Sequence, residues 1–116
     1  MWLCTRHGVF SIVRKKAGEI HVRARCRKDL EALCDAAALD QSKIIRTYPA
    51  DYRWRLVVGQ AQYEILMDAI VASLDYPNFK PVIAGTPAQR DKLPVYFGFH
   101  ADMERWQDER ETLRRR

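Results

Sequence analysis

The sequence predicts an α+β protein in which helices cover one face of a four-stranded antiparallel sheet. Short runs of alternating apolar and polar residues predict the strands, and stripes of apolar residues three and four positions apart predict the helices. These segments follow the order strand, strand, helix, strand, strand, helix, with a loop and a further helix at the end. This order is typical of a two-layer α+β fold, ferredoxin-like or related to it.

The chain has 116 residues, of which 47% are hydrophobic and 30% are charged. This composition is that of an ordinary globular protein and excludes disordered and fibrous classes. We expect a single domain, in which residues 1–80 form the α+β core. Residues 81–116 are expected to form a proline-containing loop and a C-terminal helix that packs on the same domain.

The first strands lie near the N-terminus. Residues 2–5 and 9–13 are rich in β-branched and aromatic side chains and are divided by a segment that contains Gly8, which predicts one bent strand or a tight hairpin. After a turn at 15–19, the clearest alternation covers residues 20–26. One set of its side chains faces the core (Ile20, Val22, Ala24, Cys26) and the other set faces away (His21, Arg23, Arg25, Arg27).

The next three elements follow from apolar spacing and from prolines. Residues 28–39 carry a helical stripe, and residues 44–48 and 52–58 predict a hairpin that turns at Pro49. On the second arm, three apolar residues (Trp54, Leu56, Val58) alternate with Arg53, Arg55 and Val57. A second helix is predicted over residues 60–74.

The C-terminal part contains a loop and a third helix. Three prolines and a glycine within residues 81–95 predict the loop. The helix is expected from about Phe99 to the end of the chain, with a narrow apolar stripe (Phe99, Met103, Trp106, Leu113).

Basic residues gather in the N-terminal quarter of the chain. Residues 1–28 hold eight Lys or Arg and one acid, Glu19, for a charge of +7, whereas residues 29–116 hold 12 basic and 14 acidic residues, for −2. The total is the formal net charge of +5. This asymmetry predicts a local basic surface and not a protein that is cationic all over.

The sequence also indicates where the protein resides. It has no apolar run long enough for a membrane span and no apolar stretch typical of a secretory signal. Its three cysteines form no CxxC pair and are expected to be reduced. We therefore expect a cytoplasmic protein that does not contact membranes.

Four segments resemble a family of short, uncharacterised bacterial proteins. They are MWLCTRHGVFSIVRKK, IHVRARCRKDLEAL, DYRWRLVV and LDYPNFK. The family pattern is MWxxTxxGFFSVV, VRARxRxDLxxL, TDYxxR and DYxNFK, and it covers about residues 1–80. The resemblance implies a shared fold and no activity. After Lys80 the chain departs from the Trp- and Tyr-rich helix with which family members often end.

Arginines on the predicted sheet form the candidate binding site. If helices cover one face, the other face displays side chains from two strands, together with Arg46 or Tyr48 depending on the register. These side chains are His21, Arg23, Arg25, Arg27, Arg53 and Arg55. Guanidinium groups and flat rings on an open sheet are typical of proteins that bind single-stranded nucleic acid or RNA. We expect a small, non-enzymatic binding protein that contacts nucleic acid or a nucleoprotein complex.

A competing arrangement would hide these arginines. In it, they pair with acidic residues of the C-terminal helix (Asp102, Glu104, Asp108, Glu109).

The sequence does not indicate a catalytic or metal site. Cys4 and His7, with His21 and Cys26, match no common closed zinc site. A nucleophile formed by Cys4 with His7 or His100 has no orienting third group. Phosphate-binding loops, HExxH and GxSxG are absent from the sequence. We expect no cofactor.

The alternative function is a protein-interaction module or a small inhibitor or regulator of phage or bacterial type, such as an anti-CRISPR-like protein, able to form a homodimer. Trp106 is then the natural interface anchor, and Phe79 lies in a segment, 75–80, that either closes the core or docks on a partner. We expect Trp106 to pack on the protein's own core, because a short chain can hardly leave several large apolar side chains in water.

Overall fold

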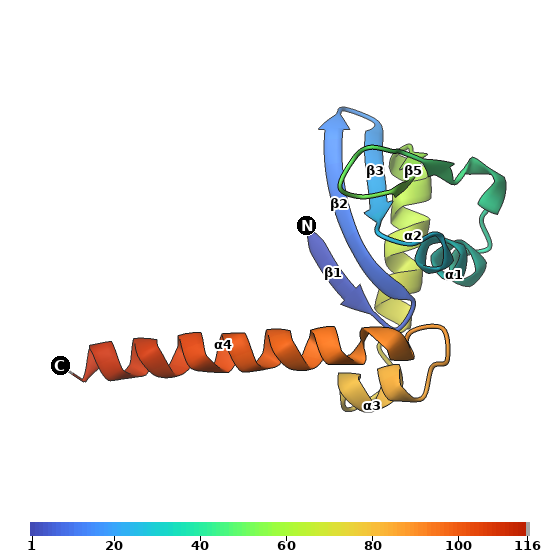
Figure 1. The fold of residues 1–116 in the computed structure, drawn as a ribbon. Coiled ribbons are helices and arrows are strands. Elements are labelled where there is room, and N and C mark those ends of the chain that lie inside the picture. The colour runs from blue at the N-terminus through green and yellow to red at the C-terminus, as the bar shows by residue number, and fades with distance from the viewer. Residues whose placement is uncertain (116) are drawn as a thin grey trace. The chain divides into compact units, whose positions relative to one another are not determined.

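A computed structural model describes residues 1–115 of the chain (Figure 1). The chain divides into two compact units, one from Met1 to Pro77 and the other from Asn78 onward, and each is described here by itself. The single domain, with residues 81–116 packed on the core, stays a prediction.

The first unit holds one antiparallel sheet. Within the described residues it has five strands in the order β1-β2-β3-β5-β4, so the predicted number of four is wrong. The strands are β1 (Trp2–Thr5), β2 (Gly8–Lys16), β3 (Glu19–Ala24), β4 (Ile45–Arg46) and β5 (Trp54–Val58). The fifth strand arises because residues 2–13 form a hairpin of two strands, one of the two arrangements predicted for this segment.

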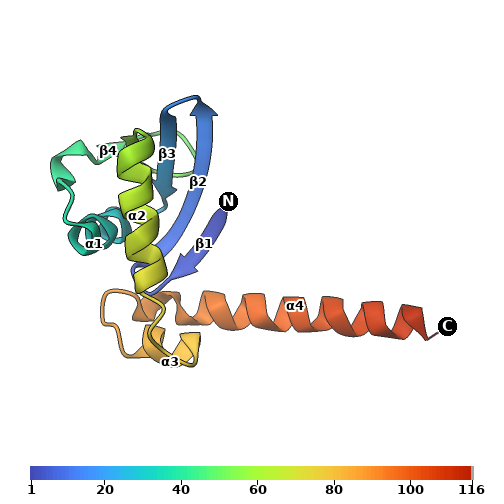
Figure 2. The same ribbon diagram turned by 180° about the vertical axis from the view of Figure 1, so that it is seen from behind.

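Two helices, α1 (Arg27–Ala37) and α2 (Gln60–Ala72), pack on one face of the sheet. Figure 2 shows α2 in front of the strands, on the side opposite to that seen in Figure 1. The short helix η1 (Gln41–Lys43) follows α1. Both long helices were expected, and their bounds differ from the predicted ones by at most two residues.

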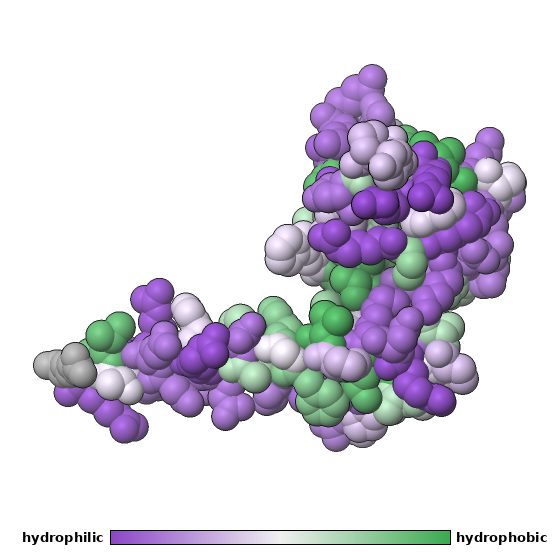
Figure 3. Space-filling view, in the orientation of Figure 1, coloured by the Kyte–Doolittle hydropathy of each residue, from purple (hydrophilic) through white to green (hydrophobic). Residues whose placement is uncertain are grey.

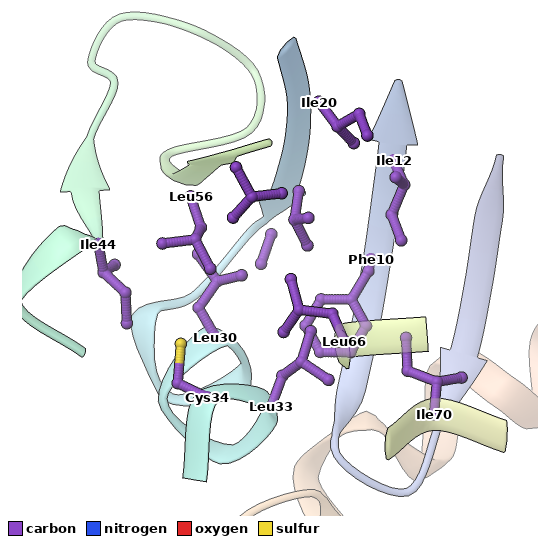
Figure 4. Close-up of a cluster of buried hydrophobic side chains, with 13 residues drawn as sticks. Phe10, Ile12, Ile20, Leu30, Leu33, Cys34, Ile44, Leu56, Leu66 and Ile70 are labelled. Atoms are coloured by element: carbon purple, nitrogen blue, oxygen red, sulfur yellow. The ribbon is translucent and has the colours of Figure 1, made fainter. Parts of the chain in front are cut away.

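The core lies between these helices and the sheet (Figure 4). Every second residue of β3 contributes to it: Ile20, Val22 and Ala24 are at most 1% exposed. Phe10 and Ile12 of β2 and Leu56 and Val58 of β5 continue the same layer, and helices supply Leu30, Leu33, Cys34, Leu66 and Ile70. The alternation that predicted the core face of β3 is therefore confirmed as far as Ala24.

The turn between β1 and β2 is fastened to the start of α1. The Thr5 hydroxyl accepts hydrogen bonds from the amides of His7 and Gly8, and Oδ2 of the buried Asp29 accepts one from the Val9 amide. Gly8 has a φ of 153°, which favours glycine. This arrangement holds the edge strand β1 beside β2.

The strand β3 ends two residues earlier than expected. Cys26 is the N-cap of α1 and is half-buried, and Arg27 is the first residue of the helix. Arg25, Cys26 and Arg27 therefore all lie beyond the strand β3, which corrects the predicted strand over residues 20–26.

The second unit contains α3 (Phe79–Ala84), η2 (Arg90–Lys92) and α4 (Leu93–Arg114). The loop predicted over residues 81–95 is therefore wrong at both ends. Pro81 and Pro94 lie in the first turn of α3 and of α4, where the missing N–H has no partner within the helix to lose. The ring of Phe79 packs edge-on against that of the buried Tyr96, with centroids 4.8 Å apart.

The apolar side chains of the predicted stripe on helix α4 are exposed to solvent. Phe99 is 63% exposed, Trp106 is 51% exposed and Leu113 is 60% exposed, so the expectation that Trp106 is buried in a core is wrong. Figure 3 shows green, apolar residues along this helix. Among residues 1–115, no helix is both long and apolar enough to cross a lipid bilayer.

Candidate nucleic-acid interface

The face of the sheet opposite α1 and α2 is called the open face. Residues that pair directly across antiparallel strands point to the same face, so the register defines its rows. One row runs across all five strands and consists of Trp2, Ser11, Arg23, Arg55 and Ile45. A neighbouring row holds Val13, His21 and Val57. Three predicted site residues, His21, Arg23 and Arg55, therefore lie together on this face.

The loop between β4 and β5, residues 47–53, folds over the open face and passes in front of β3 in Figure 1. Its Tyr52 is 9% exposed and contacts two arginines. The guanidinium carbon of Arg23 is 4.8 Å from the centre of the Tyr52 ring, and that of Arg25 is 4.4 Å from it. Both cations therefore make cation–π contacts with one phenol ring, which restrict the two side chains.

Further hydrogen bonds orient the two arginines. A terminal nitrogen of Arg23 donates to the Ser11 hydroxyl at 2.6 Å, and Arg25 donates to the backbone carbonyl of Asp51 at 3.2 Å. These hydrogen bonds use at most two of the five N–H donors of each guanidinium group. Arg25 remains exposed to solvent, whereas Arg23 is half-buried.

Arg55 is held by an imidazole. It contacts Nδ1 of His21 at 2.8 Å, and because arginine can only donate, Nδ1 is the acceptor in this contact. The proton of His21 is then on Nε2, which donates to Glu19 at 3.0 Å. This hydrogen bond, together with Lys16, lowers the pKa of the Glu19 carboxyl below its usual value. The chain Arg55–His21–Glu19 thus orients a half-buried cation.

Arg53 is the last residue of the same loop, and its guanidinium carbon is 5.1 Å from the centre of the Tyr48 ring. Tyr48 is 68% exposed, and a cis peptide bond joins it to Pro49. Arg53 and Tyr48 therefore extend the arginine and tyrosine contacts into solvent at the margin of the open face.

Two predicted site residues belong elsewhere. The register pairs Arg46 with Trp54, and Trp54 with the buried Ala24, so Arg46 projects from the helix-covered side of the sheet. Arg27, at the start of α1, also lies over the Trp54 ring at 5.4 Å and pairs with Glu31. The register thus decides against Arg46 in the choice between Arg46 and Tyr48. Neither Arg46 nor Arg27 belongs to the open face.

The arginines of the open face are not neutralised by carboxylates. Within residues 1–115, Arg23, Arg25, Arg53 and Arg55 form no ion pair with an acidic side chain, whereas Arg6 pairs with Asp75. In α4, Asp102 and Glu104 form ion pairs with residues of their own helix, Arg105 and His100. Hydrophilic residues, drawn in purple, gather over the strands and the loop in Figure 3.

Trp2 belongs to the open face and is missing from the predicted set. It lies in the same row as Arg23, and its side chain is 80% exposed. On β1 and β2 the neighbouring positions of this face are Cys4, Val9 and Val13. The alternation of side chains along a strand identifies these residues once β1 is known to pair with β2. The sequence left open whether these residues form such a hairpin or one bent strand.

The other candidate chemistries receive no support from the geometry. Among the described residues, no three His, Cys, Asp or Glu side chains are arranged to hold a metal ion. Burial, and then the neighbouring Arg6, lower the pKa of His7, and burial raises the pKa of the Cys4 thiol. The Cys4 thiol is therefore not activated as a nucleophile.

No family model matches the chain, and neither a curated protein nor a solved structure shows significant similarity to it. The resemblance to a family of short bacterial proteins stays a prediction. Its first three segments contribute Ser11, Arg23, Arg25 and Tyr52 to the contacts of the open face.

Proposed function

We propose that the protein binds nucleic acid through its open face, either a bare single strand or RNA, or the nucleic acid of a nucleoprotein complex. The carrying observation is the cluster of Arg23, Arg25, Arg53 and Arg55, which lacks carboxylate partners among residues 1–115 and is held by tyrosine rings and an imidazole. Phosphate groups supply the negative charge that this cluster lacks.

The stacking on Tyr52 prepares the arginines for binding. A free arginine side chain loses conformational freedom when it binds, and this loss weakens the complex. Arg23 and Arg25 are already ordered by one ring and by hydrogen bonds to Ser11 and to the Asp51 carbonyl. Their remaining donors can therefore engage phosphate oxygens at a reduced entropic cost.

The test is binding to a fluorescent 20-nucleotide RNA and to single-stranded DNA at several salt concentrations. We expect affinity to fall linearly with salt on a double-logarithmic plot, with a slope of about −0.7 for each phosphate neutralised. The double variant Arg25→Ala/Arg53→Ala should lose about ten-fold or more in affinity and reduce the slope by about one unit or more. Both side chains are exposed, so the fold should persist.

The matched control is Arg105→Ala/Arg115→Ala, which removes the same charge from exposed positions of the second unit outside the α4 seam. If the control lowers binding as much as the open-face variant, the effect is one of net charge and the proposal is wrong. Failure of the unaltered protein to bind either polymer at low salt also overturns it.

A second candidate, self-association through α4, rests on its exposed stripe. Phe99, Met103, Trp106, Arg110 and Leu113 follow spacings of four and three residues, which is the pattern of a coiled-coil seam. In a parallel pair, Glu109 of one helix flanks this seam beside Arg114 of a second copy, with opposite charge. The stripe spans only two heptads, so we expect the pairing to be weak.

Sedimentation over a range of concentrations tests this candidate. A dimer that is lost in Trp106→Glu, and retained in the off-stripe variant Thr112→Glu, supports it. A monomer at every concentration overturns it. The ferredoxin-like, bacterial and cytoplasmic assignments remain predictions and carry no part of either proposal.

A further inference from the structure

The open face has two halves of different chemistry. The half formed by β3, β5 and the loop 47–53 is cationic, with arginines stacked on tyrosines. The half formed by β1 and by residues 9–13 of β2 is apolar and consists of Trp2, Cys4, Val9 and Val13, apart from the buried Ser11. The boundary lies between β2 and β3, where Arg23 reaches across to the hydroxyl of Ser11, the residue that pairs with Trp2.

Trp2 is positioned to receive a flat group. Its strand is an edge strand held in place by the pairing with β2 and by the hydrogen bond from the Met1 amino group to the Ile12 carbonyl. Its side chain is nevertheless 80% exposed, although an indole gains free energy when its faces are covered. Within the described residues, no cation or ring is stacked on Trp2, in contrast to Tyr48, Tyr52 and Trp54.

We infer that Trp2 is the base-stacking residue of the site and that the ligand is a strand of unpaired nucleotides. This inference rests on the proposed function. The phosphates lie over the arginine half, and a base lies against the indole at the edge of the sheet. Trp2 and Arg23 lie two strands apart in one row, and a base and its phosphate belong to one nucleotide, so the two halves bind one stretch of chain.

The same division argues against a regular duplex as the ligand. In a duplex the bases are paired and stacked on one another, and their flat faces are inaccessible to a side chain. A duplex would contact the arginines with its phosphates and leave the indole without a base. Single-stranded sites combine a cationic track with aromatic stacking, and the open face provides both.

The experiment compares three ligands of equal length and label: a 12-nucleotide oligothymidine, the same backbone without bases, and a blunt duplex. We expect the protein to bind oligothymidine more tightly than the abasic strand and the duplex at the same salt concentration. Trp2→Ala should weaken oligothymidine binding by about 5- to 100-fold, the range found for base stacking, and should leave abasic binding unchanged.

Two further measurements separate stacking from charge. Trp2→Ala should leave the salt dependence of binding unaltered, because it removes no phosphate contact, whereas Arg25→Ala should reduce the slope. Trp2→Phe should restore most of the affinity, since a smaller ring still stacks. Phe97→Ala, which removes an exposed aromatic ring from α4 at a position outside the stripe of Phe99, Met103 and Trp106, is the matched control and should bind as the unaltered protein does.

The outcomes distinguish this inference from the proposed function. Equal binding of oligothymidine and the abasic strand, with no effect of Trp2→Ala, overturns the stacking role and leaves phosphate binding in place. Tighter binding of the duplex overturns the choice of ligand. No binding of any of the three at low salt overturns the proposed function itself.

Discussion

The α-carbon of Gly8 faces the carboxyl group of Asp29 so closely that a methyl group on Gly8 would lie 2.3 Å from the Asp29 carboxyl carbon. Both residues are buried, and Oδ2 of Asp29 accepts a hydrogen bond from the next amide, that of Val9. This contact joins the first turn of α1 to the hairpin that carries Trp2.

We expect Gly8→Ala to destabilise the protein by about 3 kcal/mol or more. The new methyl group overlaps a buried side chain, and the φ of 153° strains any residue with a Cβ. Urea unfolding followed by circular dichroism measures the loss.

Gly98→Ala is the control for this substitution. Gly98 lies inside α4, and an added methyl group would meet no atom within 4 Å. Alanine favours helix, so we expect the variant to gain up to about 1 kcal/mol in helix stability. Equal stability of Gly8→Ala and the unaltered protein would contradict the close contact.

His7 should make stability depend on pH. Burial and the charge of Arg6 lower the pKa of His7 in the folded protein, so the unfolded state binds the proton more readily. The free energy of unfolding should therefore rise with pH between this lowered pKa and the ordinary value of 6.5, and stay lower below that window. His7→Gln should remove this slope in urea unfolding from about pH 5 to about pH 8. If the pH dependence persists in His7→Gln and disappears in His100→Gln, it comes from His100 and the prediction for His7 is wrong.

Tyr52→Ala should destabilise the first unit by about 3–5 kcal/mol, since it removes a buried ring and two cation–π contacts. Tyr52→Phe keeps the ring and should remain within about 0.5 kcal/mol of the unaltered protein. Thermal unfolding of the two variants measures the difference. If both variants unfold at the same temperature, the ring of Tyr52 does not contribute to the stability of the fold.

Trp106→Ala should cost less than about 1 kcal/mol in a dilute solution of the monomer, because half of the Trp106 side chain is already exposed. Emptying a buried aromatic site would cost about 3–5 kcal/mol, the loss expected if Trp106 lay in a core. Urea unfolding at low protein concentration decides between these values, and a loss in the higher range would contradict the exposure seen in α4.

The sequence by itself determined which side of β3 is buried, and where the two long helices of the first unit lie. These features depend on the local spacing of residues such as Ile20, Val22 and Leu30, since alternation and helical stripes are visible within a dozen residues. The predicted loop over residues 81–95 failed because a proline's effect depends on its position in a helix, and the sequence does not show where α3 and α4 begin.

Only the tertiary structure decided which side chains share the open face. Trp2 stands beside Ser11 and Arg23 because of the register of β1 on β2, and Arg46 is excluded because of the register of β4 on β5. Tyr52 contacts both Arg23 and Arg25 because the loop 47–53 folds back over the sheet. A one-residue slip would send each strand side chain to the other face, and short-range spacing does not specify register. The register between paired strands, together with the fold of the loop 47–53, therefore creates the site.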